Sequence, residues 1–389
     1  MPPIDLLTLT DGGQQADDIA RRVAAFIAES RRTLDLALYD VRLPDPTGSI
    51  VADELRAADS RGVRVRLAYN VDCGRPAALH PPPSTRPEIL EELPIETVAI
   101  SGIPDLMHHK YALRDGEAVW TGSTNWTVDS WTRQENAIVV AESPGLAAAY
   151  LANFAELWER RDVEHSGFVD PDPQRVGEAE IRAWFTPGHG EELSQRIATA
   201  IGSARRRVRI ASPVITSAPI LGTLAEIADK GTMDVAGVVD EPQTDTVFGQ
   251  WRENGHTAWK IPLLATALSR LSFSGKRSTP WSPDSVHDFM HAKVAVADDT
   301  AFIGSFNLSR SGERNAENVL EIREPALADR MAAFVDDVRA RYPAVSVPEQ
   351  AMATIPSGSS LKSGIEKSSA EIRPSASSRD SIHSKRPDQ

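Results

Sequence analysis

Residues 108–115 read HHKYALRD, and residues 291–298 read HAKVAVAD. Both stretches fit the pattern H-x-K-x-x-x-x-D, and each is followed by a G-S-x-N tetrapeptide, at 122–125 and 304–307. In both halves of the chain, a Glu-Asn pair begins ten residues after the asparagine of that tetrapeptide. The equal spacing indicates that one large unit was duplicated, and an internal duplication is a strong guide to the fold.

Both motif copies are embedded in the same order of predicted elements. A helical pattern leads into a short apolar run typical of a strand, a second helix and strand follow, and each half closes with a long helix that begins near a proline. This order predicts an α/β fold with two similar mixed β-sheet domains flanked by helices. The expected elements are residues 17–30, 34–39, 50–60, 63–69 and 144–160 in the first half, and 191–203, 208–211, 220–230, 234–239 and 325–341 in the second.

The length of 389 residues exceeds the usual size of one domain and favours two compact units. We expect an N-terminal domain at residues 1–160, a linker at 161–176 that contains a Pro-Asp-Pro sequence, and a C-terminal domain at 177–343. Residues 344–389 are rich in serine and have no apolar period, so we expect a disordered tail. Because both motif copies lie in one chain, we expect a monomer without a stable protein partner.

Charge and cysteine content narrow the classes of function. The formal net charge is −13, and the tail carries six basic against five acidic residues, so the acidic excess lies in residues 1–343. Such an excess disfavours broad contact with nucleic acid or an anionic bilayer. The single cysteine, Cys73, excludes an intrachain disulfide and fits a reducing compartment. The sequence shows no signal peptide and no run of about 18 apolar residues, so we expect a soluble, cytoplasmic protein.

The first motif copy predicts a hairpin that gathers polar groups. Asp115-Gly116 is a strong turn signal between two strand-like runs. Side chains two residues apart on a strand share a face, so His108 and Lys110 point the same way, as do Ser123 and Asn125. A two-residue loop would set Ser123 opposite His108. The hairpin then presents an imidazole, an ammonium, a hydroxyl and an amide to one spot, a set that fits a phosphate group. Asp115 lies at an odd offset from His108 and should face away, in a structural role.

The second copy supplies what one hairpin lacks. Displacing an alcohol from a phosphodiester requires a nucleophile on one side of phosphorus and a proton donor near the leaving oxygen. A pseudo-twofold relation would bring His108 against His291, so that one imidazole attacks phosphorus and the other protonates the leaving group. Water activated by the second histidine would then hydrolyse the phosphohistidine. Lys110, Lys293 and the motif asparagines neutralise charge as metal ions do in other phosphoryl-transfer enzymes, so we expect neither a metal nor a cofactor.

The duplicated motifs resemble those of the phospholipase D superfamily over about residues 5–342. The resemblance implies the phospholipase D-like fold, in which two domains pack about a pseudo-twofold axis and share one metal-free phosphate site. It also implies that His108 is the nucleophile and His291 the acid, and that Glu135 and Glu317 each orient a motif histidine. The candidate site then consists of catalytic His108, Lys110, His291 and Lys293, phosphate-binding or supporting Ser123, Asn125, Ser305, Asn307, Glu135 and Glu317, and structural Asp115 and Asp298.

The substrate stays open between a phospholipid and a nucleic acid. The acidic charge favours lipid, as do apolar residues before the second motif, in or beside an irregular stretch expected at 268–284 that parallels a proline-rich one at 71–87. Such residues would receive acyl chains or rest on a membrane surface. Lys276-Arg277 favours nucleic acid, as does the stretch 109–136, which is similar to small one-motif bacterial nucleases and their mitochondrial relatives. The apolar residues are Leu263, Leu264, Leu268, Leu271, Phe273 and Trp281.

We predict a phosphodiesterase of the phospholipase D type that hydrolyses a phospholipid to phosphatidate and an alcohol. A nuclease of the same superfamily, acting on DNA or RNA, is the main alternative. A phosphatidyl transferase such as a cardiolipin synthase is a further one, although it would be expected to carry apolar N-terminal helices. His109 and His287 break the spacing to lysine and are expected to have no chemical role, and we expect Trp126 and Trp131 to pack in the core.

Overall fold

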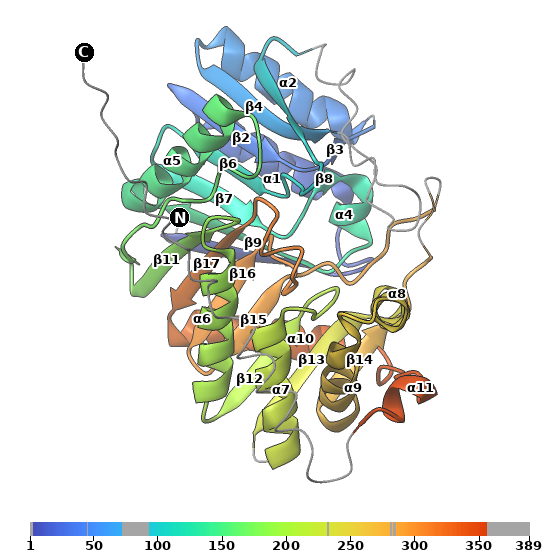
Figure 1. The fold of residues 1–389 in the computed structure, drawn as a ribbon. Coiled ribbons are helices and arrows are strands. Elements are labelled where there is room, and N and C mark those ends of the chain that lie inside the picture. The colour runs from blue at the N-terminus through green and yellow to red at the C-terminus, as the bar shows by residue number, and fades with distance from the viewer. Residues whose placement is uncertain are drawn as a thin grey trace, which may run out of the picture. The chain divides into compact units, whose positions relative to one another are not determined.

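The computed structural model describes residues 3–44, 46–71, 93–231, 233–280, 282 and 285–355. Among these residues, two large mixed sheets carry the architecture (Figure 1). The first consists of β1 (Ile4–Leu9), β2 (Thr33–Leu38), β4 (Arg64–Val71), β5 (Glu96–Ser101), β6 (Lys110–Arg114), β7 (Ala118–Gly122) and β9 (Asn136–Glu142). The second consists of β10 (Gln174–Val176), β11 (Ala179–Phe185), β12 (Arg207–Ala211), β13 (Asp234–Asp240), β14 (Ser272–Lys276), β15 (Val294–Ala297), β16 (Thr300–Gly304) and β17 (Asn318–Arg323). A separate small pair joins β3 (Val41–Arg42) and β8 (Trp126–Thr127).

The two sheets repeat one topology. The strand orders are β1-β9-β7-β6-β2-β4-β5 and β10-β11-β17-β16-β15-β12-β13-β14. In the first sheet β2 runs parallel to β4 and antiparallel to β6, and in the second β12 runs parallel to β13 and antiparallel to β15. The predicted fold class, two similar mixed sheets with helices, is confirmed. The helices are α1 (Ala16–Ala28), α2 (Thr47–Ser60), α4 (Val128–Thr132), α5 (Pro144–Arg160), α6 (Gly190–Ser203), α7 (Ala218–Lys230), α8 (Glu241–Glu253), α9 (Ile261–Arg270), α10 (Pro325–Ala340) and α11 (Glu349–Met352), with a short 3-10 turn η1 (Ala258–Lys260).

Helices cover both sheets because their apolar side chains recur at helical spacing. Helix α1 packs beside α2 in the first half, and α6, α7 and α9 lie side by side along the second sheet (Figure 1). Helices α5 and α10 contribute to one buried cluster that contains strands of both sheets. Within it the ring of Tyr150 on α5 meets that of Phe185 on β11, with centroids 5.1 Å apart. The two halves therefore share a core, and the motif strands lie in the middle of each sheet.

The expected linker and tail differ from the structure in part. Residues 174–176 of the expected linker form β10, which pairs with β11. The expectation of disorder from residue 344 is wrong for 344–355, because this segment covers the edge of β14 and then forms α11. The backbone N–H of Gly275 donates to Pro343, and that of Val345 donates to Phe273. An edge strand presents unpaired backbone groups, and these bonds occupy them. Residues 356–389 lie outside the described part of the chain.

The apolar stretch before the second motif is not a lipid-facing loop. Leu263, Leu264 and Leu268 lie on the buried face of α9, and Phe273 is buried on β14. The expectation of an irregular stretch from residue 268 is therefore wrong as far as residue 276, since a helix end and a strand occupy it. These side chains belong to the core, because helical and strand periodicity aims them inward. Trp281 and residues 72–87 lie outside the described residues.

The first hairpin has a longer loop than predicted. Strand pairing sets Arg114 opposite Ala118, so three residues rather than two form the loop. Asp115 and Gly116 both take positive φ angles, 56° and 67°, which suits a tight turn. Glu117 is the third loop residue, which the prediction had placed in the strand. In the second hairpin Ala297 pairs with Thr300, which leaves two residues in the loop. The prediction that Ser123 lies opposite His108 is wrong by one residue of register.

Candidate active site

The two motif histidines enter the site by reciprocal contacts. The residue before each histidine forms an isolated β-bridge with the opposite half of the chain, Met107 with Ala316 and Met290 with Glu135. The same contact thus occurs twice with the two halves exchanged, as a pseudo-twofold relation between the halves requires. The motif histidines are buried, with 5% and 8% of their surface exposed, so the described chain holds both in a nearly closed environment.

Each motif histidine has an acceptor from the other half at its Nδ1 atom. Nδ1 of His108 lies 2.8 Å from Oε2 of Glu317. Nδ1 of His291 lies 3.1 Å from Oδ1 of Asn136. The amide of Asn136 is oriented by its own bonds, because Nδ2 donates to the carbonyl of Ser130 at 2.9 Å. The acceptors therefore differ in kind, an ionisable carboxyl group for one histidine and an uncharged amide for the other.

The two motif lysines are held identically. Lys110 Nζ donates to the carbonyl of His108 at 2.6 Å, and Lys293 Nζ donates to the carbonyl of His291 at 2.6 Å. Each is 2% exposed. Lys110 also lies 4.9 Å from the ring centre of Tyr39, which meets the ring of His108 edge-on at 4.7 Å. Two buried ammonium groups beside two imidazoles form a site suited to an anion.

The motif serines support the acceptors. Ser123 Oγ donates to Oδ1 of Asn136 at 2.7 Å and accepts the backbone N–H of Ala137 at 3.0 Å. Ser305 Oγ accepts the backbone N–H of Asn318 at 3.0 Å and also bonds the carboxyl of Glu317. Both serines are fully buried. They hold the groups that orient the histidines, which is a supporting role rather than direct contact with phosphate.

The motif asparagines sit at equivalent positions with a shared feature. Asn125 is 6% exposed and Asn307 is partly buried. Within the described residues, the buried Oδ1 atom of each has no hydrogen-bond partner. Buried polar groups normally have one, so a matched pair of unpartnered amide oxygens is a feature expected at a ligand site.

Glu135 does not reach His291, contrary to the role that the family resemblance implied. Its carboxylate is bound to Lys276 at 3.0 and 3.2 Å and accepts the hydroxyl of Tyr342. The cause is a difference in register between the halves: β7 and β9 pair Gly122 with Ile138, whereas β16 and β17 pair Gly304 with Val319.

A shift of one residue moves a side chain to the other face of a strand. The first half therefore presents Asn136 at the place where the second half presents Glu317, although the Glu-Asn pairs lie at the same spacing in the sequence. Asn318, the second residue of the Glu317-Asn318 pair, points away from the place where Glu317 contacts His108. It lies 3.1 Å from Nδ1 of His109 and accepts the hydroxyl of Thr121 at 2.6 Å.

Burial changes the ionisation of the whole cluster. Burial, with the charges of Lys110 and Lys293, holds the pKa values of His108 and His291 well below their usual range. Burial also lowers the pKa of Lys110 to about 7 and holds that of Lys293 well below its usual range. The pKa of Glu317 is raised to about 8 by burial, against the pull of both lysines. A bound anion would reverse the shifts of the lysines and of His291, because it favours their charged forms.

The motif aspartates face away from the histidines and fasten the hairpin turns. The carboxylate of Asp115 accepts the backbone N–H groups of Arg31, Arg32 and Thr33 at 2.7 to 2.9 Å. Asp298 accepts the equivalent three groups of residues 205–207 at 2.8 to 3.1 Å. Burial opposes ionisation of Asp115, yet these bonds lower its pKa overall. Both carboxylates thus bind backbone groups at the turns, and their structural role stays a prediction.

Several residues beyond the motif pattern also take part in or surround the site. Asn136 was visible in the sequence as the partner of Glu135, but equal spacing concealed which of the two faces the site. Tyr39 carried no sequence signal. Trp126 and Trp131 are buried at 2% and 0% exposure, so the prediction that they pack is confirmed. His109 is fully buried against the ring of Tyr111, with centroids 5.0 Å apart.

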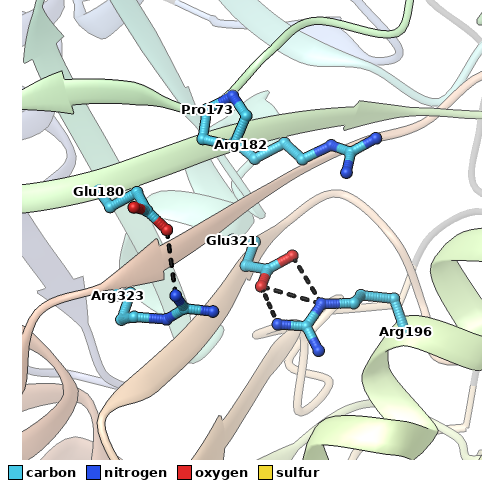
Figure 2. A pocket seen from close by; sticks show the side chains of 6 residues that line it. All are labelled: Pro173, Glu180, Arg182, Arg196, Glu321 and Arg323. Atoms are coloured by element: carbon cyan, nitrogen blue, oxygen red, sulfur yellow. Dashed lines mark hydrogen bonds and ion pairs between the residues drawn. The ribbon is translucent and has the colours of Figure 1, made fainter.

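A cavity of about 170 Å³ on the second sheet is lined by three arginines, and Figure 2 shows it. Each arginine has a carboxylate partner: Arg196 binds Glu321, Arg323 binds Glu180 at 3.1 Å, and Arg182 binds Asp170. The charges are thus compensated within the protein, and the arginines do not form an anion site. The remaining lining residue is Pro173.

Metal-ligand clusters and membrane-spanning helices are both absent from the described residues. No three histidine, cysteine, aspartate or glutamate side chains in this part of the chain converge as a metal site would require. None of its helices has the length and apolar character needed to cross a membrane.

Similarity to known proteins supports the family that the motifs predicted. The family described as "Cardiolipin synthase, PLD-like domain" matches residues 23–158 and 197–338. The chain therefore belongs to the phospholipase D superfamily, as its motifs predicted. It is 27% identical over 146 residues to the mitochondrial cardiolipin hydrolase of Xenopus tropicalis, covering 38% of this chain and 64% of that protein. It is also 27% identical over 153 residues to the human mitochondrial cardiolipin hydrolase, covering 39% and 56%. The chain thus spans less than two thirds of these relatives.

Solved structures share the fold across nearly the whole chain. Phosphatidylserine synthase from Haemophilus influenzae superposes with a TM-score of 0.59 at 13% identity, covering 95% of this chain and 93% of that one. Polyphosphate kinase from Porphyromonas gingivalis gives a TM-score of 0.54 at 13% identity, covering 94% and 56%. At such identity the likeness concerns the fold alone, and the two names show that one fold serves different reactions.

Proposed function

We propose that this protein hydrolyses a phosphodiester in two steps through a phosphohistidine on His108. In the first step Nε2 of His108 attacks phosphorus, the bond from phosphorus to the alcohol oxygen breaks, and protonated His291 gives its Nε2 proton to that oxygen. In the second step water gives a proton to His291 and attacks phosphorus. The phosphorus–nitrogen bond then breaks, which releases the phosphate product and restores His108.

The difference between the two Nδ1 acceptors carries this assignment. Nδ1 of His108 faces the carboxylate of Glu317, which stabilises a ring that becomes positive when its other nitrogen bears phosphorus. Nδ1 of His291 faces the neutral amide of Asn136, which stabilises a positive ring less. The imidazolium of His291 is then the stronger acid and the better proton donor. The roles agree with those that the family resemblance implied.

The remaining motif residues bind the phosphoryl oxygens. Lys110 and Lys293 would regain their charge beside an anion, and the amides of Asn125 and Asn307 add hydrogen-bond donors. These four groups supply the neutralisation that the reaction requires. Turnover is therefore expected to continue in EDTA at wild-type rate. A loss of activity that Mg²⁺ or Zn²⁺ restores would contradict this.

We propose a phospholipid as the substrate. The support is the description of the matched family and the names of the relatives, which are cardiolipin hydrolases. The net charge of −13 also disfavours extended contact with a nucleic acid backbone. The apolar stretch near α9 adds little support, because Leu263, Leu264, Leu268 and Phe273 are buried and only Leu271 is partly exposed among its described residues.

A substrate panel tests the proposal. Purified protein would be assayed with vesicles of cardiolipin or phosphatidylcholine, single-stranded DNA, duplex DNA, RNA and bis-p-nitrophenyl phosphate, each with EDTA present. The expected result is phosphatidate release from lipid and turnover of the small diester, both lost in His108→Ala. Cleavage of single-stranded DNA that depends on His108, with no release from lipid, would make the protein a nuclease.

A further inference from the structure

A buried lysine outside the motifs connects the two halves beside the site. Lys276, on the edge strand β14, is 3% exposed. Its Nζ lies 3.0 and 3.2 Å from the carboxylate oxygens of Glu135, donates to the carbonyl of Arg133 at 2.9 Å, and lies 3.3 Å from Oδ2 of Asp11. Tyr342 donates to the same Glu135 carboxylate. An ammonium group has three donors, and the surrounding residues can engage all of them.

The pseudo-equivalent position in the first half holds no charge. In the second sheet Asp240 pairs with Lys276, and in the first sheet Asn70 pairs with Ile100. Asp240 and Asn70 correspond, because the side chain of each accepts, at 3.0 Å, the backbone N–H of the methionine before a motif histidine. Lys276 therefore corresponds to Ile100, which is fully buried.

Glu135, the partner of Lys276, also has an uncharged residue at its equivalent position. Glu135 forms a β-bridge with Met290, the residue before His291. Ala316 forms the equivalent β-bridge with Met107, the residue before His108. Glu135 thus corresponds to Ala316, which is fully buried in the core cluster that also contains Ile100. One junction of the halves carries an ion pair, and the matching junction carries an isoleucine and an alanine.

The ion pair decides which side chain meets the acid histidine. Neighbouring residues in extended chain point in opposite directions, so a carboxylate directed at Lys276 turns the next residue, Asn136, toward His291. A slip of one residue would bring Glu135 to His291 and leave a buried ammonium without its carboxylate, which is strongly unfavourable. At the other junction, alanine and isoleucine place no such demand on the register.

We infer that Lys276 is a positioning residue: through Glu135 it holds the register that sets an amide, rather than a carboxylate, against His291. The consequence for leaving-group protonation rests on the proposed function. The positioning itself is a property of the structure and can be measured without turnover.

The test replaces Glu135 and Lys276 by the residue types found at the equivalent junction. Glu135→Ala combined with Lys276→Ile reproduces the pair Ala316 and Ile100 and leaves neither a buried carboxylate nor a buried ammonium of this pair behind. Histidine-labelled protein would be followed by ¹⁵N NMR at fixed pH, with the imidazole signals assigned through His108→Ala and His291→Ala. We expect the Nδ1–H signal of His291 to shift or broaden, because no buried charge then excludes the register slipped by one residue, while that of His108 stays in place.

A matched control removes a buried ion pair elsewhere. Arg66 and Asp35 pair at 2.6 Å between β2 and β4, with 14% and 3% of their side chains exposed. Asp35→Asn combined with Arg66→Met should leave the His291 signal unchanged. An unchanged His291 signal in the Glu135/Lys276 variant, or equal shifts of both histidines, would overturn the inference. If the double variant does not fold, Glu135→Gln, which keeps the size but leaves the ammonium of Lys276 without a carboxylate, should likewise shift the His291 signal and leave that of His108 unchanged.

A kinetic measurement connects the position to the reaction. A p-nitrophenolate leaving group needs little protonation, whereas the alcohol of a phospholipid needs an acid. The double variant should therefore raise the ratio of the first rate to the second by about tenfold or more. An unchanged ratio in an active variant counts against the inference. If the wild type turns over neither substrate, the proposed function fails, and the NMR comparison still decides the role of Lys276.

Discussion

The two halves of this chain carry the same letters around the site and present different atoms. The second half directs a carboxylate, Glu317, at the histidine of the first half, and the first half directs an amide, Asn136, at the histidine of the second. The lysines, by contrast, are held by the same bond at the same 2.6 Å distance in both halves. Duplication therefore preserved the cationic groups and differentiated the acceptors.

Equal spacing in a sequence therefore does not guarantee equal geometry. The first half contains one more residue between its motif serine and the acceptor than the second half does, counted as 123 to 136 against 305 to 317. Because strand side chains alternate, one residue is enough to exchange glutamate for asparagine. In the proposed mechanism, this difference makes one of two similar histidines the nucleophile and the other the acid.

The largest expected effect separates the two histidines themselves. His108→Ala should abolish covalent labelling by substrate phosphorus and lower the rate by more than about 10⁴-fold, because nothing replaces the nucleophile. His291→Ala should cost about 10²- to 10³-fold with an alkyl leaving group and much less with p-nitrophenolate. Rapid-quench labelling with a radioactive diester measures both. Phosphate trapped on His291 would reverse the roles.

The acceptors should differ in importance. Glu317→Gln is expected to lower turnover by about 10²-fold, because a neutral amide no longer stabilises the positive phosphohistidine ring. Asn136→Ala should cost about tenfold, since it removes one neutral hydrogen bond. Asn136→Glu would make the halves alike and should slow leaving-group departure. Equal losses in Glu317→Gln and Asn136→Ala would show that the acceptor charges do not distinguish the histidines.

Anion binding should depend on pH through the lysines. Burial lowers the pKa of Lys110 to about 7, so its charge is lost as pH rises through that value. Binding of tungstate, which keeps its own charge over this range, should weaken above pH 7 by up to about tenfold per pH unit and take up a proton. Calorimetry in buffers of different ionisation enthalpy counts the protons. Lys110→Met should bind more weakly with a flatter pH profile, and an identical profile would contradict the assignment.

The smallest effects are expected at the two turns, where the halves behave alike. Asp115→Ala removes an acceptor of three backbone N–H groups and should cost about 1 to 2 kcal/mol of stability, with little change in kcat. Asp298→Ala should cost a similar amount. Urea unfolding of both variants measures the comparison. A loss of activity much larger than the loss of folded protein would place these carboxylates in the chemistry.

The sequence was sufficient for the fold class because the motif copies and the helix and strand patterns repeat together. The positions of Asp115 and Asp298 followed from turn chemistry. Register did not follow, because three loop residues and two loop residues both satisfy the hairpin signal at Asp115-Gly116. The contact of Glu135 with Lys276 was hidden as well, since the two residues are 141 positions apart and lie in different halves.

The prediction that the apolar residues before the second motif face lipid was wrong for a related reason. Leu263, Leu264 and Leu268 form the buried stripe of a helix, and a stripe of this kind looks the same in a sequence whether it meets a core or a membrane. The decision depends on what packs against it, and in this fold its neighbours include α7, α11 and β14. The proposed substrate class therefore rests on the relatives and on the net charge.

The short segment at 343–345 has a consequence for handling the protein rather than for its chemistry. Its backbone bonds to β14 close an edge of the second sheet that would otherwise offer open donors and acceptors to another chain. A chain cut after Tyr342 would retain both histidines, both lysines and the Lys276 cluster. It would also gain an exposed strand edge, so that self-association and loss of solubility, not loss of catalytic groups, become the first result of trimming.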